Sequence, residues 1–167
     1  EDQEQVIIDG EPKTKPVGWK QWDEKNSIYQ VNPETGLSSV ASTVYIFEKD
    51  GRKYFYSGGW LYERKIKVST DQDYTFGFWS MVSDRRISPR LNMPMYDAEG
   101  NEIAGGWAEF HLDDPHEWQR LYLLTIGPNS LNQWPKDVNS IGIILSATPG
   151  SATKVGFTGK ASFDRVF

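Results

Sequence analysis

The chain has no cysteine and only two histidines among its 167 residues. The lack of cysteine excludes disulfide bonds, thiolate nucleophiles and cysteine-ligated zinc sites. No run of about 18 apolar residues is present, so we expect no transmembrane helix. The lysines and arginines form no long basic run and the net charge is −5, so a groove that tracks nucleic-acid phosphates is not expected either.

What the chain does have is aromatic side chains, which make up 14% of the residues and include seven tryptophans. Such rings dominate both cores and interfaces, so some are expected in the core and some on a binding surface. The length suits one domain over residues 1–167, with residues 1–5 as a disordered tail. The absence of an initiating methionine suggests a processed piece of a larger protein, and residues 1–5 lack the features of a signal peptide.

Short apolar segments separated by polar turns run through most of the chain. Asp50-Gly51 is typical of a hairpin turn, and the segment 97–101 is a further turn signal. Strands at this density favour an all-β fold, an antiparallel β-sandwich or barrel, over any fold with βαβ units. Residues 11–42 are polar and contain three prolines, which predicts a long, irregular and functional loop region.

Period-two alternation separates the two faces of the predicted strands. The residues expected to face the core are Tyr74, Phe76, Phe78, Leu91, Met93, Met95, Ile141, Ile143 and Leu145. The opposite parity gives Trp79, Arg90 and Asn92, together with the small residues Gly77, Gly142 and Ser146. A ring beside polar and small residues predicts a shallow groove, although Trp79 lying under a loop is the alternative.

Four motifs follow one another in a characteristic order: residues 74–79, 96–102, 118–121 and 163–166. Together they resemble the galactose-binding-like carbohydrate-binding modules, whose families bind cellulose, xylan and glucans. The resemblance covers residues 60–167 well and residues 1–59 weakly. It implies a jelly-roll domain that binds polysaccharide or oligosaccharide without catalysis.

In such modules, rings stack on the apolar faces of sugars while amides, arginines and carboxylates bond to hydroxyl groups. The resemblance makes Trp79, Arg90 and Asn92 candidates on a concave face. The loop candidates are Trp60, Trp107 and Trp134, with Tyr56 in support. The alternative for each loop tryptophan is that it caps one end of the core.

Relatives in this group also carry a structural calcium ion, which requires several oxygen ligands. By resemblance, Asp9, Glu11 and Asp164 are its expected ligands here, although the sequence around Asp9 departs from the usual pattern. The alternative is that Asp164 only bonds to backbone amides.

Signals of catalysis are weak. The segment 111–116 holds both histidines and two aspartates, but its spacing matches no metal motif, and a solvated turn is expected. Neither a nucleophile elbow nor a phosphate loop is present. We therefore expect no enzyme activity.

The leading hypothesis is an extracellular carbohydrate-binding domain that holds a larger parent protein on a glycan. One alternative is an accessory domain of a phage tail or baseplate that binds host-wall saccharide. Another is a glycan lyase or hydrolase with acids on the concave face. A third is a structural or adhesive sandwich without ligand, which predicts that Trp60, Trp79, Trp107 and Trp134 are all buried.

Overall fold

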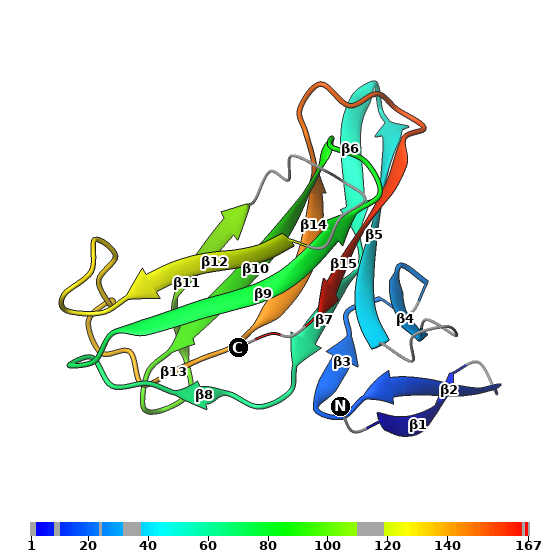
Figure 1. The fold of residues 1–167 in the computed structure, drawn as a ribbon. Helices are drawn as coiled ribbons and strands as arrows, with labels where there is room; N and C mark the ends of the chain where they lie inside the picture. The colour runs from blue at the N-terminus through cyan, green and yellow to red at the C-terminus, as the bar shows by residue number, and fades with distance from the viewer. Residues whose placement is uncertain are drawn as a thin grey trace.

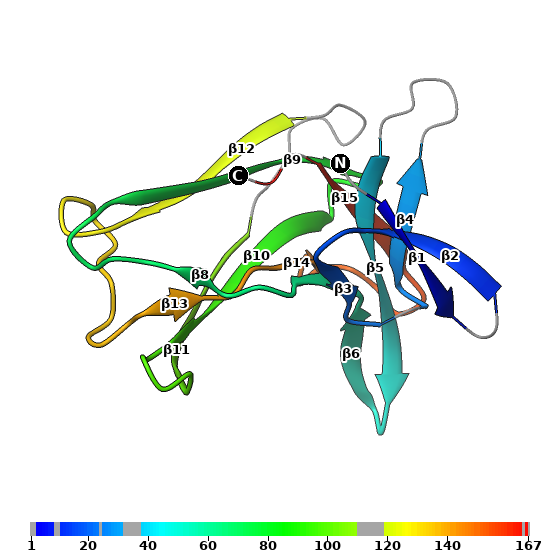
Figure 2. The same cartoon turned by 90° about the horizontal axis from the view of Figure 1, so that it is seen from below.

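The computed structural model describes residues 3–8, 11–23, 25–31, 38–109, 119–164 and 166. The described residues form fifteen β-strands and no helix. Most of these strands pair into two sheets that lie one above the other (Figures 1 and 2). The predicted antiparallel sandwich is therefore confirmed.

The first layer is a six-stranded sheet. Its strands are ordered β12 (Gln119–Ile126), β9 (Tyr74–Val82), β15 (Thr158–Asp164), β5 (Ser38–Lys49) and β4 (Ser27–Val31), and β6 (Arg52–Ser57) also pairs with β5. The hairpin of β5 and β6 runs on past the rest of this layer (Figure 2). Its turn has positive φ at Asp50 (52°) and Gly51 (69°), the backbone that tight hairpins need.

The second layer is a seven-stranded sheet. Its strands are ordered β3 (Trp19–Gln21), β7 (Gly59–Tyr62), β14 (Ile144–Pro149), β10 (Ile87–Tyr96), β13 (Ser140–Ile141) and β8 (Ile66–Lys67), and β11 (Glu102–Glu109) also pairs with β10. Among the described residues, the paired strands of both layers are all antiparallel.

The N-terminal region is more ordered than the sequence suggested. The strand β1 (Gln3–Ile8) pairs with β2 (Glu11–Pro16), and Gln3 is already opposite Pro16. The expectation of a disordered tail is therefore wrong for residues 3–5. The segment 11–42 is likewise not one irregular loop, because β2, β3, β4 and the start of β5 lie within it.

The core lies between the two layers, and alternation along the strands fills it. Leu91 and Met93 of β10 are buried, as are Leu145 of β14 and Phe78 of β9. Phe78 packs edge-on against Phe163, with ring centroids 5.4 Å apart. Of the core positions predicted from sequence, Tyr74 and Phe76 are only half-buried, and the others are buried. Within the described part of the chain, no helix is long and apolar enough to cross a membrane.

Candidate functional site

The outer face of the seven-stranded sheet collects polar side chains at its centre. Along β10 the burial alternates, so that Leu91 and Met93 point into the core while Arg90 and Asn92 lie half-buried on the other side. On the neighbouring strand β14, Ser146 is the register partner of Arg90, and Ile144 is the partner of Asn92. Partners across an antiparallel pair share a face, so these side chains form one surface.

A hydrogen bond organises this surface. The Asn92 side-chain amide donates to the Ser146 hydroxyl at 3.1 Å. An amide and a hydroxyl each have more than one hydrogen-bonding position, so the pair has the chemistry to bond to a polar ligand as well. Small side chains beside it keep the surface shallow, because Gly59 of β7 is the register partner of Ser146.

An exposed tryptophan borders this polar centre. The Trp22 side chain is 62% exposed, and its backbone N–H donates to the carbonyl of Gly59 at 2.8 Å. A methyl group built on Gly59 would lie 3.6 Å from the Cβ atoms of both Trp22 and Ser146. The side chains of Trp22 and Ser146 therefore begin on either side of Gly59, which places no side chain between them.

The turn that carries Trp22 is fixed to the sheet by hydrogen bonds. The Ser27 hydroxyl donates to the Gly59 carbonyl at 2.8 Å and accepts from the Gly59 N–H at 2.9 Å. The Gln21 side-chain amide donates to the Ser27 carbonyl at 2.6 Å. Residues on both sides of Trp22 are thus bound in place, so the backbone that carries its ring needs little ordering.

A carboxylate closes the same turn. Asp23 accepts from the Asn26 side-chain amide at 2.7 Å and from the Lys25 N–H at 2.9 Å. The Asn26 bond is the main cause of a lowered Asp23 pKa, and a bond with the Tyr56 hydroxyl contributes. The same carboxylate raises the pKa of Tyr56. Tyr56 therefore supports the turn, and it also stacks on Tyr45 with ring centroids 5.5 Å apart.

The surface continues onto β11. There the register places Trp107 opposite Asn92 and Glu109 opposite Arg90. From β7 to β11 the face crosses three interstrand steps, about 14 Å at the usual strand spacing. It is long enough for more than one sugar ring, with Trp22 at one side and position 107 at the other. We call this surface, formed by Trp22, Arg90, Asn92, Ile144 and Ser146, the outer face.

Trp79 does not belong to the outer face. It lies on β9 in the other layer, opposite Asp164 and Arg120, and the inward positions of that strand are Phe78 and Ser80. Its half-buried ring therefore points to the opposite side of the sandwich from Arg90. The predicted groove that joined Trp79 to Arg90 and Asn92 is wrong, although Arg90 and Asn92 do lie together.

Two predicted loop tryptophans lie elsewhere. Trp60 is in β7 rather than in a loop, and its side chain is fully buried, with the indole N–H donating to the Ala41 carbonyl at 3.0 Å. A ring with no exposed surface cannot stack on a sugar, so Trp60 is not a site residue. Trp134 is half-buried, donates to the Gln72 carbonyl at 3.2 Å and packs edge-on against Tyr74. The alternative of a structural sandwich without ligand predicts that Trp79 and Trp134 are buried as well. Neither of them is fully buried.

Of the expected calcium ligands, Asp9 lies outside the described residues, Glu11 begins β2 and Asp164 ends β15. In the part of the chain that is described, no three acidic or histidine side chains gather as a metal site. The calcium site therefore stays a prediction from the resemblance, and the segment 111–116 also lies outside the described residues.

Sequence reasoning missed Trp22 as a site residue. The signal that could have found it is its place in the polar segment 11–42, which the sequence had marked as functional. What the sequence could not show is that this segment supplies a strand, β3, that adds Trp22 to the edge of β7.

Comparison with known proteins supports this architecture. No protein-family model and no curated protein matches the chain. Among solved structures, the enzymatically active domain of tailspike protein 4 from bacteriophage CBA120 matches with a TM-score of 0.53 and 12% identity over 90% of this chain. The module TmCBM61, solved with β-1,4-galactotriose, matches with a TM-score of 0.50 and 14% identity over 90% of this chain and 87% of its own.

A structure described as CBM4 has a TM-score of 0.49 and 13% identity over 91% of this chain and 94% of its own. The chain has the jelly-roll fold of carbohydrate-binding modules. At these identities the likeness shows the fold alone. The chain spans only 19% of the tailspike chain, so in the tailspike the shared fold is one part of a larger protein.

Proposed function

We propose that this domain binds a polysaccharide or oligosaccharide through the outer face, without catalysis. The observation that carries the proposal is the 62% exposed Trp22 ring, held beside the hydrogen-bonded pair of Asn92 and Ser146. Sugars present apolar CH patches next to hydroxyl groups. An exposed ring on a held backbone, with polar groups nearby, matches both features.

The shared fold adds support, because TmCBM61 was solved with a bound galactotriose. Binding of this kind would hold a larger parent protein on a glycan outside the cell. We propose an extracellular setting for that reason. The face combines the Arg90 guanidinium with neutral groups, so both neutral and acidic glycans belong in the search for the ligand.

The test is a panel of neutral and acidic polysaccharides, with tryptophan fluorescence as the readout of saturable binding. Trp22→Ala should lower the affinity at least tenfold, since truncating an aromatic anchor typically costs about 2 kcal/mol of binding energy. Trp79→Ala is the matched control, because Trp79 lies on the opposite side of the sandwich. Loss of binding in Trp79→Ala with full binding in Trp22→Ala would contradict the proposed face.

A second candidate is a domain of a phage tail or baseplate that grips host-wall saccharide. The similarity to a bacteriophage tailspike domain favours it, and it needs the same outer face. The sequence of the parent protein and its neighbouring genes would decide between the two settings. Failure of all glycans to bind would favour an assembly role instead.

A further inference from the structure

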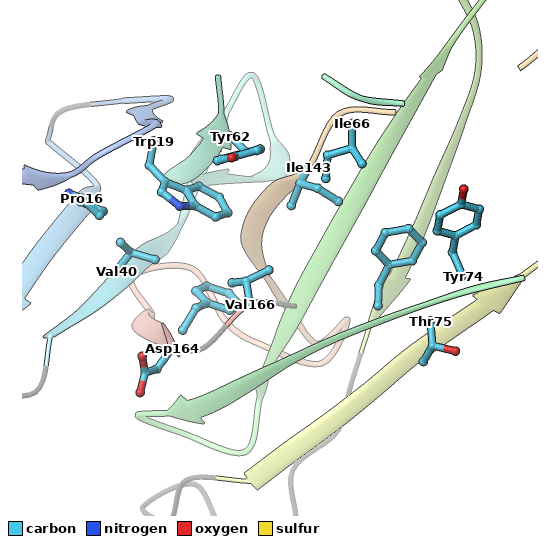
Figure 3. A pocket seen from close by; sticks show the side chains of 12 residues that line it. Pro16, Trp19, Val40, Tyr62, Ile66, Tyr74, Thr75, Ile143, Asp164 and Val166 are labelled. Atoms are coloured by element: carbon cyan, nitrogen blue, oxygen red, sulfur yellow. The ribbon is translucent and has the colours of Figure 1, made fainter. Parts of the chain in front are cut away.

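A cavity opens between the two layers, on the core side of the seven-stranded sheet. It has a volume of about 460 Å³. Its walls come from both sheets and include Trp19, Tyr62, Ile66, Phe76, Ile143 and Phe163 (Figure 3). Trp19 and Tyr62 lie with ring centroids 5.3 Å apart and form one corner. We call this cavity the inter-sheet slot.

The walls of the slot present apolar groups. Among its lining residues, Thr75 and Asp164 occupy outward positions on their strands, and Trp19, Tyr62 and Tyr74 carry one polar group each on an aromatic ring. The Tyr74 hydroxyl already accepts from the Ser69 N–H at 3.1 Å. Thr75 hydrogen bonds to the hydroxyl of Thr125, with the oxygens 2.8 Å apart. Asp164 follows the buried Phe163, and Figure 3 shows its carboxylate directed away from the Trp19 ring. The slot is therefore poorly suited to a charged ligand.

A sugar does not fit this lining. Each buried hydroxyl group without a partner costs free energy, and the aromatic and aliphatic walls supply few partners. Protein interiors are normally close-packed, so an opening of this size between two layers is unusual. Its volume and its aromatic lining are those of pockets that bind small molecules.

We propose that the inter-sheet slot binds the hydrocarbon chain of a small, neutral, single-chain molecule, with the polar end of that molecule toward the solvent near the exposed lining residue Val166. This site is separate from the glycan site. The adjacent residues Ile143 and Ile144 show the separation, since Ile143 lines the slot while Ile144 lies on the outer face. The proposal stands even if the domain binds no glycan.

The experiment titrates the protein with normal alcohols from hexanol to dodecanol. Trp19 is the only tryptophan among the described lining residues, so its fluorescence reports entry of the chain. Affinity should rise about fourfold for each added methylene group, until the slot is full. No saturable binding by any alcohol would overturn the proposal. Binding only to neutral phosphatidylcholine vesicles, without binding of free alcohols, would also overturn it.

Three variants locate the binding. Ile66 is half-buried on the short strand β8, so Ile66→Phe should fill the slot at little cost in folding and lower affinity at least tenfold. Ile66→Ala enlarges the slot, so the alcohol that binds most tightly should have a longer chain than with the natural protein. Ile144→Phe is the matched control and should leave alcohol binding unchanged. Equal affinities and the same optimal length in all three variants would refute the assignment, and the alanine variant keeps the test valid if the phenylalanine variant unfolds.

Discussion

Replacing Trp60 tests whether this residue belongs to the core rather than to a ligand site. Its side chain has no exposed surface and it packs in the cluster between the layers. Trp60→Ala removes the whole indole from that cluster. It also removes the partner of the buried Ala41 carbonyl, which accepts the indole N–H at 3.0 Å.

The magnitude follows from these two losses. Truncating a buried tryptophan to alanine typically costs about 3–5 kcal/mol of unfolding free energy. For a domain of this size each kcal/mol lowers the Tm by about 2–4 °C, so Trp60→Ala should lower it by about 6–20 °C. Trp60→Phe keeps a large ring but loses the hydrogen bond, and should cost about 1–3 kcal/mol.

The assay is urea unfolding followed by far-ultraviolet circular dichroism, supported by thermal melts. The order of stability should be the natural protein, then Trp60→Phe, then Trp60→Ala. A Trp60→Ala cost below about 1 kcal/mol would refute the burial argument, because a side chain exposed in a loop gives effects of that size.

Two further predictions concern a close backbone contact and a surface ion pair. A methyl group on Gly58 would lie 2.1 Å from the Asn26 carbonyl oxygen, so Gly58→Ala should lower the Tm by several degrees, while Gly150→Ala, with only ordinary contacts, should leave it nearly unchanged. Equal melts for both variants would contradict the contact. Arg86 holds the pKa of Asp84 at about 2, chiefly through side-chain hydrogen bonds. Because this folded-state pKa lies below the ordinary 3.8, the pair's stabilisation is present above pH 4 and lost as the pH falls toward 2. An NMR titration should show the Asp84 pKa rising toward 3.8 in Arg86→Gln, and an unchanged value would refute the pairing.

Alternation along the strands was enough to predict which residues face the core. Phe78, Leu91, Met93, Ile141 and Leu145 are all buried as predicted. These predictions succeed because side chains in a strand alternate between two sides whatever the topology. The prediction of a sandwich follows from the same signal.

Alternation could not tell one outward face from the other. Trp79 and Arg90 both point outward, but a sandwich has two outer surfaces, and only the order of strands assigns β9 and β10 to different layers. The sequence was misleading at Trp60 for another reason. The Gly58-Gly59 pair before it does not make a flexible loop, since both glycines allow close packing against neighbouring segments.

The measurement that tests the central claim most directly is a heteronuclear NMR titration with a glycan that binds. The account predicts that the indole N–H of Trp22, the side-chain amide of Asn92 and the backbone amide of Ile144 shift together and saturate at one dissociation constant. The indole signal of Trp79 should not move. Shifts confined to Trp79 and its neighbours on the six-stranded sheet would contradict the account.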